Sequence, residues 1–299
     1  MSLIERALEK TRALGAKPPA SANVRPQVPA AELPYVPPQP VTARVVRPMP
    51  TRRLTIDMER LRYEGMIPPA EAQRRLSMQV RSIKNKLLQA VRAGGAVRDR
   101  IIMVTSALAG DGKTFNSVSI ALSLATEKDF HVLLVDGDIP KPSVGNLFGI
   151  HEAPGLLDAA REPTLDPEQL VIGTDLPGLD LLSVGRSGVD SAESMSSSRM
   201  RDIIDRLATV PNRIVLLDSA PLLLTSEAAV LAQYAGQVLL VVREAVTPQQ
   251  AVLDALAMLG ERQGIAMILN GVSESKLEQA YYGYDQYYGY GEEQGASDA

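Results

Sequence analysis

The stretch RIIMVTSALAGDGKT, residues 100–114, decides the fold of this chain. Its first half is a short apolar run, typical of a strand buried on both faces of a parallel sheet. Its second half, Ala107 to Thr114, matches the phosphate-binding P-loop pattern, with alanine in place of the first glycine. The pattern requires a strand before the loop and a helix after it, which we predict at about 113–126. The stretch therefore predicts a nucleotide site on an α/β fold.

The physical chemistry of the loop assigns roles to its residues. Gly110 and Gly112 let the backbone curl so that successive N–H groups point inward, and the helix N-terminus behind them attracts anions. Lys113 is expected to reach the β- and γ-phosphates of ATP, and Thr114 to bind Mg²⁺ through its hydroxyl. The other loop residues expected to surround the nucleotide are Leu108, Ala109, Asp111 and Phe115.

Five more apolar runs follow, at residues 131–136, 179–184, 213–218, 237–242 and 265–270. Helical segments separate them, and this alternation predicts a doubly wound, mostly parallel sheet with helices on both faces. Ligands on such sheets lie at the carboxyl ends of the strands.

Three aspartates stand at those strand ends. Asp136 and Asp138 close the second run, and Asp218 closes the fourth. In P-loop proteins an acid on a neighbouring strand holds Mg²⁺ directly or through water, a role that fits Asp218 and also Asp136. Asp136 and Asp138 are expected to share one site, where one assists the metal and the other accepts a proton from an incoming hydroxyl. Which of the two is the base stays open, and any one of the three could instead be a helix cap or a turn residue.

The segments before this region differ from it in composition. Residues 1–16 predict a short amphipathic helix. Ten of the 21 prolines lie within residues 17–50, which predicts a disordered linker. Residues 51–98 predict a basic helical arm, with a short helix at 52–65 and a longer one at 69–93.

Charge is unevenly distributed, although the formal net charge is only −4. Residues 44–100 carry 14 Lys and Arg against five Asp and Glu, whereas residues 101–299 carry 12 against 27. The basic arm could lie on anionic lipid, on nucleic acid or on the acidic body of a neighbouring copy, or it could be a solvated helix face. No aromatic side chains alternate with its charges, so a nucleic-acid partner is not expected.

Composition also excludes several kinds of chemistry. The chain has no cysteine and two histidines, which excludes disulfides, a thiolate site and a histidine-rich metal centre. No apolar stretch approaches the ~18–20 residues that a membrane helix needs, and the N-terminus lacks a signal peptide's apolar run. These features predict a cytoplasmic protein.

Three motifs together resemble the bacterial tyrosine kinases of the capsule and exopolysaccharide type. They are SALAGDGKT (106–114), VLLVDGDIPKPS (132–143) and IVLLDSAPLL (214–223), in the places of the Walker A, Walker A′ and Walker B motifs. The likeness is greatest to the autokinases of exosortase-linked systems, which have an N-terminus like MSLIERALEK and a stretch like RSIKNKLL (81–88). It implies a deviant P-loop ATPase fold over 99–273, ATP and Mg²⁺ as cofactors, and phosphoryl transfer to tyrosine.

The resemblance gives a role to YYGYDQYYGY, residues 281–290. Elsewhere the chain has only three tyrosines, Tyr35, Tyr63 and Tyr234. Members of the family autophosphorylate a C-terminal tyrosine cluster, and interleaved glycines predict that segment 274–299 is flexible enough to enter a neighbour's site. The tyrosines in that place are Tyr281, Tyr282, Tyr284, Tyr287, Tyr288 and Tyr290.

The same resemblance implies further contacts. Asn270 is expected to contact adenine, although a strand cap is an equal alternative. Arg81 and Lys84 are expected to contact the next subunit of a ring. A membrane protein that regulates polysaccharide chain length is expected to activate the kinase through its cytoplasmic segment and to recruit it to the inner face of the membrane.

The chain also departs from the family's motifs. The family's Glu-x-x-Arg-x-x-Arg motif reads Met78-x-x-Arg81-x-x-Lys84 here, and Lys141 takes the place of the arginine pair that follows Walker A′. Walker B, which commonly ends Asp-x-Pro-Pro, ends here with Ala220 before a single proline.

Two other functions stay open. One is a partitioning-type ATPase, a nucleotide-driven switch that transfers nothing to tyrosine, but its signature lysine would fall at Leu108. The other is a nucleotide-binding scaffold, against which the intact Lys113, Thr114 and aspartates argue. A eukaryotic-type kinase is excluded because the chain has neither a His-Arg-Asp nor an Asp-Phe-Gly motif.

Overall fold

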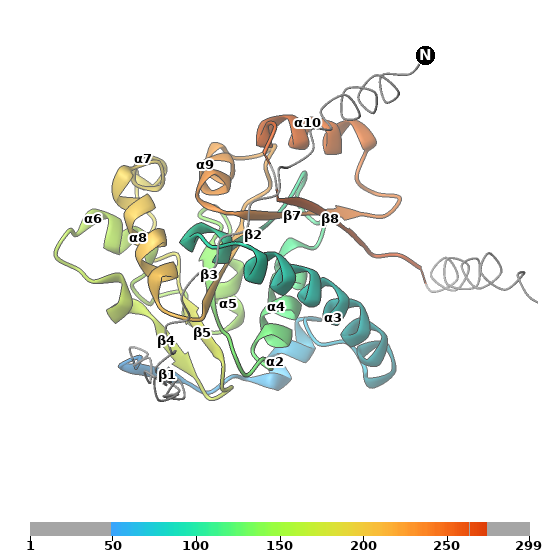
Figure 1. The fold of residues 1–299 in the computed structure, drawn as a ribbon, viewed down its shortest axis with the longest axis horizontal. Coiled ribbons are helices and arrows are strands. Elements are labelled where there is room, and N and C mark those ends of the chain that lie inside the picture. Colours follow the sequence, from blue (N-terminus) through green and yellow to red (C-terminus); the bar gives the residue numbers. More distant parts are fainter. Residues whose placement is uncertain (1–48, 263, 274–299) are drawn as a thin grey trace, which may run out of the picture. The chain divides into compact units, whose positions relative to one another are not determined.

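The computed structural model describes residues 49–262 and 264–273 (Figure 1). The predicted N-terminal helix, nearly all of the proline-rich linker and the tail 274–299 with its six tyrosines lie outside the described residues. Within the described ranges, no helix combines the length and the apolar character needed to cross a bilayer.

Eight strands form one sheet in the order β1-β4-β5-β3-β6-β2-β7-β8. Every neighbouring pair is parallel except β4 and β5. This confirms the predicted mostly parallel sheet. The strands are β1 (Arg52–Leu54), β2 (Ile101–Ser106), β3 (His131–Gly137), β4 (Ile172–Thr174), β5 (Leu179–Leu182), β6 (Arg213–Ser219), β7 (Gln237–Arg243) and β8 (Ile265–Asn270).

Helices cover both faces of the sheet (Figure 1). Successive residues of a central strand belong to opposite core clusters, as Ile102 and Met103 of β2 do. Because both faces are buried, the strands are continuously apolar rather than alternating. On one face lie α2 (Met58–Tyr63), α3 (Ala70–Ala93), α4 (Lys113–Leu124) and α5 (Ser143–Leu147). On the other lie α6 (Leu156–Arg161), α7 (Ser191–Met195), α8 (Ser198–Thr209), α9 (Ser226–Tyr234) and α10 (Gln249–Leu259).

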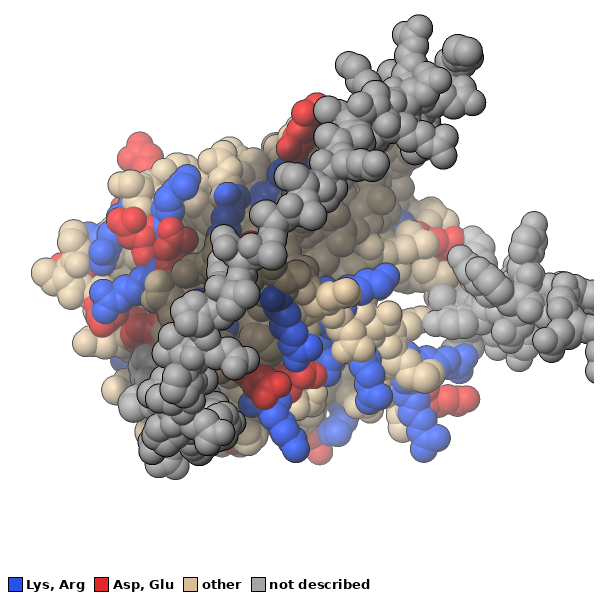
Figure 2. Space-filling view, in the orientation of Figure 1, with Lys and Arg blue, Asp and Glu red and all other residues tan. Residues whose placement is uncertain are grey.

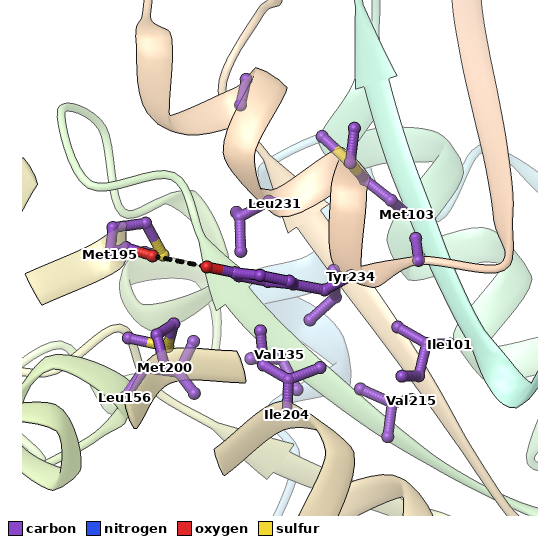
Figure 3. Packing of buried hydrophobic residues seen from close by; sticks show 14 of the residues in the cluster. Ile101, Met103, Val135, Leu156, Met195, Met200, Ile204, Val215, Leu231 and Tyr234 are labelled. Carbon is purple, nitrogen blue, oxygen red and sulfur yellow. Dashed lines mark hydrogen bonds between the residues drawn. The ribbon is translucent and has the colours of Figure 1, made fainter. Parts of the chain in front are cut away.

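Figure 3 shows the core on the second face, around the ring of Tyr234. This side chain is 5% exposed, and its hydroxyl donates a hydrogen bond to the Met195 carbonyl at 3.2 Å. A buried tyrosine hydroxyl needs such a partner. Tyr234 is therefore a packing residue, whereas Tyr63 of α2 is 89% exposed.

The short helix predicted at 52–65 is wrong in its first part. Arg52–Leu54 is the edge strand β1, parallel to β4, and the helix starts only at Met58 after its N-cap Asp57. Both strands of this pair have three residues, too few for a hydrophobic period to be read. They are recognised as strands only because β1 pairs with β4 and β4 pairs with β5.

The longer helix was predicted correctly, because α3 begins after Pro69 and ends before Gly94. Its buried side chains, among them Val80 and Leu87, belong to the same core cluster as α4 and the sheet. Residues 51–98 therefore share a core with the sheet that follows them, although the predicted domain boundary at 98 stays a prediction.

One polar residue of α3 lies inside this packing. Lys84 is 6% exposed, and its ammonium group is 2.6 Å from the Glu127 carboxylate. It also lies 3.4 Å from the Ser123 carbonyl, to which it donates. Lys84 is thus an internal ion-pair partner and not a surface residue, which leaves Arg81, exposed on the same helix, as the predicted subunit contact.

Candidate active site

The P-loop joins β2 to α4 at the carboxyl end of the sheet. Gly110 and Gly112 have φ angles of +87° and +98°, a backbone region that strongly favours glycine. A Cβ at Gly112 would also collide with the side-chain amide of Asn270. Because α4 begins at Lys113, the positive end of its dipole faces the loop. The predicted strand, turn and helix are all present.

Two side chains that lie far from the P-loop in the sequence, those of Thr247 and Asn270, hold the loop in place. Asp111, 2% exposed, accepts hydrogen bonds from the Leu108 N–H at 3.0 Å and from the Thr247 hydroxyl at 2.7 Å. The Asn270 amide donates to the Asp111 carbonyl at 2.8 Å. Asp111 and Asn270 therefore shape the loop. Sequence reasoning missed Thr247, which is 136 residues from Asp111.

Asn270 also borders a hollow of about 380 Å³ between α3 and β8. Phe115 and Asn116, from the start of α4, line the same hollow. The adenine contact predicted for Asn270 stays a prediction, since the described contact of its amide is with the P-loop.

Four of the predicted site residues form one connected cluster. The Lys113 ammonium is 2.6 Å from the Asp138 carboxylate and 3.4 Å from the Thr114 hydroxyl. The Thr114 hydroxyl donates to Asp218 at 2.8 Å. A residue that the sequence did not indicate, Ser117, donates to the other oxygen of Asp218, also at 2.8 Å. The cluster links α4 to the ends of β3 and β6.

The two aspartates of Walker A′ have different surroundings. Asp136 lies directly opposite Asp218 in the β3–β6 register and is fully buried. Its carboxylate accepts the backbone N–H groups of Asp138 at 3.2 Å and Gly145 at 2.7 Å. Asp138 follows the last residue of β3, Gly137, and its carboxylate faces Lys113. The strand ends between the two residues, so strand alternation no longer governs where Asp138 points.

Burial and charge shift the pKa values of this cluster. Burial raises the pKa of Asp136 to about 7, against the opposing effect of the Gly145 N–H. Burial also raises the pKa of Asp218, although Lys113 and the Thr114 hydroxyl oppose it. For Lys113, burial alone would lower the pKa, but Asp218 and Asp138 outweigh burial and raise it. The lysine is therefore held as an ammonium ion among three carboxylates.

A cleft of about 660 Å³ opens over the P-loop. Lys113, Thr114 and Asp138 line it, and so does Lys141. Its further wall comes from the segment around α2, through three residues that the sequence did not indicate: Arg60, Glu64 and Met66. Arg60 is positioned by a hydrogen bond to the Asn146 carbonyl at 2.7 Å.

Two oxygen groups here fit Mg²⁺. The Thr114 hydroxyl lines the cleft, and the buried Asp218 carboxylate accepts its hydrogen bond; both are hard oxygen ligands, which this ion prefers. Among the described residues, no three His, Cys, Asp or Glu side chains are grouped to hold a metal by themselves. Mg²⁺ is usually bound by one or two carboxylates together with substrate phosphates.

A glycine loop between a buried strand and a helix, with acids at the ends of the next two strands on one side, β6 and β3, defines a P-loop nucleotide-binding fold. Comparison with known proteins identifies the relatives. The chain is 31% identical to the kinase domain of VpsO, a solved structure, with a TM-score of 0.53. The match covers 64% of this chain and 98% of the VpsO domain. The chain belongs to the bacterial tyrosine kinase family.

Two sequence relatives carry the same description. The chain is 26% identical to the tyrosine-protein kinase Ptk of Acinetobacter johnsonii, over 82% of this chain and 32% of Ptk. It is 29% identical to the tyrosine-protein kinase YwqD of Bacillus subtilis, over 61% of this chain and 77% of YwqD. The chain spans about a third or less of the length of the first curated relatives it matches. A scan against protein-family models found no match.

Proposed function

We propose that the chain is an ATP-dependent protein-tyrosine kinase that phosphorylates the tyrosine cluster at 281–290 of a neighbouring copy. The observation that carries this proposal is the convergence of Lys113, Thr114, Asp138 and Asp218 beside one cleft. Phosphoryl transfer depends mainly on positioning and on charge stabilisation, and this cluster offers both. Membership of a family whose relatives are named tyrosine-protein kinases supports tyrosine as the acceptor.

In the proposed reaction the tyrosine oxygen forms a bond to the γ-phosphorus while the bond to the β–γ bridging oxygen breaks and ADP leaves. Lys113 and the P-loop N–H groups bind the phosphates, with residues 108–115 around the nucleotide and Asn270 toward the adenine. Mg²⁺, when bound through Thr114 and Asp218 with support from Asp136, supplies neutralisation of phosphate charge.

Asp138 is the better candidate for the base that takes the tyrosine proton. Its carboxylate lines the cleft, whereas that of Asp136 accepts two backbone N–H groups. Lys113 pairs with Asp138 at 2.6 Å. Nucleotide phosphates would compete for the ammonium group of Lys113, and this would free Asp138 to accept a proton.

We also propose that the kinase acts in exopolysaccharide or capsule synthesis or export. Its partners would be further copies of itself, in contact through Arg81, and the cytoplasmic segment of a membrane chain-length regulator that recruits it to the membrane. The motif resemblance described above supports this part of the proposal.

Intact-mass spectrometry of the full chain after incubation with Mg·ATP tests the activity. We expect a ladder of additions of about 80 Da, one for each phosphoryl group. The additions should be absent from Lys113→Met and from a variant with all six tail tyrosines changed to phenylalanine. ATP hydrolysis without any gain in mass, even with the cytoplasmic segment of the membrane regulator added, would overturn the proposal and favour a nucleotide-driven switch.

A further inference from the structure

Helix α3 has a basic outer face. Lys84 is buried against Glu127, but the other basic side chains of the helix are exposed or half-exposed. The helix has only one acid, Glu71, which lies 3.8 Å from Arg75. Figure 2 shows Lys and Arg side chains gathered where Figure 1 places α3. These basic residues are Arg74, Arg75, Arg81, Lys86 and Arg92.

Much of this charge is not neutralised within the described part of the chain. Arg74, Arg81 and Lys86 form no ion pair with any residue of 49–262 or 264–273. The residues 74, 81 and 92 are spaced at about two and three helical turns, so they lie along one side of α3. Such a line of guanidinium groups is suited to an extended anionic partner. The group of Arg92 also lies over the Phe130 ring, 5.6 Å from its centroid, so Arg74 and Arg81 are the freer two.

The chain's own C-terminal segment continues from a point beside this helix. Strand β8 is an edge of the sheet, and its residues 267–270, with Gly271, line the same hollow as Leu76 and Ile83 of α3. The next residues along the chain are 274–299. An extended segment of that length reaches up to ~85 Å, whereas a helix of 24 residues, the length of α3, spans ~36 Å.

That segment has the opposite charge. Residues 274–299 contain six Asp and Glu and one Lys. Each phosphotyrosine adds about −1.5 to −2 at pH 7, so six of them would add about −9 to −12. Charge on the segment would therefore at least double on full phosphorylation.

We propose that the phosphorylated segment 274–299 docks on the basic face of α3 in the same chain. The source of its phosphates rests on the proposed function, but the docking itself requires only that the phosphates are present. Arginine binds phosphate through two parallel hydrogen bonds, and tethering supplies an effective concentration in the millimolar range. Docking covers Arg81, the residue predicted to contact a neighbouring subunit. Phosphorylation would in this way separate copies by occupying the contact.

The absence of cysteine allows a direct test in the full chain. Asn85→Cys on the outer face of α3 and Ser297→Cys in the tail are labelled with nitroxides, and pulsed dipolar spectroscopy measures the label separation. Tyrosines are phosphorylated by an unrelated tyrosine kinase, so that the result does not depend on the chain's own activity, and intact mass counts the phosphates. Labelled chains are diluted into unlabelled phosphorylated chains to isolate separations within one molecule.

We expect phosphorylation to convert a broad distribution of separations into one dominated by a short-distance population. That population should be lost in Arg74→Glu/Arg81→Glu and retained in Arg52→Glu/Arg53→Glu, which changes the net charge equally at β1, the opposite edge of the sheet. It should also be lost in the unmutated chain at 1 M salt, where the Debye length falls to about 3 Å.

Three results would overturn the docking proposal. They are an unchanged distribution after confirmed phosphorylation, equal losses in both charge-reversal variants, and a short population that disappears on dilution into unlabelled chains. The last result would indicate that the tail binds a neighbouring copy. Failure of the chain to phosphorylate itself would contradict the proposed function alone.

Discussion

Asp136 and Asp138 are separated by one glycine, yet they differ in what they can do. The Asp138 carboxylate lies beside the cleft and contacts Lys113, whereas the Asp136 carboxylate is held by two backbone N–H groups. Asp136 is fully buried and does not line the cleft, so an incoming substrate hydroxyl would meet Asp138 first. At the scale of single residues, this difference makes Asp138 the candidate for the base.

Asp138→Asn should lower the rate of tail phosphorylation at least about 100-fold, the lower range for loss of a general base. Nucleotide affinity should change little, because Lys113 remains to bind phosphate. Single-turnover phosphorylation and equilibrium binding of a fluorescent ATP analogue would measure the two effects. A variant that retained its rate would show that Asp138 is not the base.

Asp136 should make stability depend on pH in the metal-free chain. Its pKa rises from 3.8 in the unfolded chain to about 7 in the folded chain, so between these values the folded state binds more protons. The free energy of unfolding should therefore fall as the pH rises from about 4 to about 7, by up to about 4 kcal/mol. Asp136→Asn should remove most of this fall, because the amide oxygen can still accept the Gly145 N–H.

Urea denaturation without Mg²⁺ or nucleotide, at pH 5 and pH 8, would compare the two proteins. Asp218 contributes a fall of the same sign in both of them, so only the difference between the profiles reports on Asp136. If the free energy of unfolding changed with pH equally in both proteins, Asp136 would not be the source of this pH dependence.

At the scale of elements, a buried ion pair joins α3 to the turn that follows α4. Lys84 and Glu127 are 2.6 Å apart, with side chains that are 8% and 23% exposed. Removing one partner from such a pair leaves an unpaired buried charge, which costs several kcal/mol, whereas replacing both partners by apolar groups of similar volume costs little.

Glu127→Ala should therefore lower the free energy of unfolding by about 2–4 kcal/mol. Lys84→Met should lower it by less, because the Glu127 side chain that it leaves unpaired is 23% exposed and can be hydrated, against 8% for Lys84. In the double variant most of the loss caused by Glu127→Ala should disappear. Chemical denaturation of the four proteins gives the coupling energy. Light scattering of Lys84→Met should show an unchanged oligomeric state, and a changed one would restore Lys84 as a subunit contact.

At the scale of the whole molecule, transfer in trans can be separated from transfer within one chain. Full-length Lys113→Met supplies an inactive chain with an intact tail, and the variant with six tail phenylalanines supplies an active chain without acceptors. Mixing the two should phosphorylate the Lys113→Met tail at a rate that rises with the concentration of the active chain. Intact mass distinguishes the two proteins. If the Lys113→Met tail gains no phosphate in the mixture while the unmutated chain phosphorylates itself, transfer occurs in cis.

Local signals predicted a large part of this fold. Apolar runs, glycines and flanking prolines predicted six strands, the P-loop and α3. A buried parallel strand and a helix end each have a characteristic pattern within a few residues. The strands β1 and β4 could not, because three residues carry no period and only pairing makes them strands.

The sequence by itself determined which residues are candidates for the chemistry: Lys113 and Thr114 follow a glycine loop, and the aspartates end apolar runs. The tertiary structure decided which of them meet and in what surroundings. It directed Asp138 to Lys113 and Asp136 to Gly145, enclosed Lys84, and brought Arg60 to the cleft. The physical reason is that burial and contact arise between segments many residues apart, whereas composition and spacing are local properties of the chain.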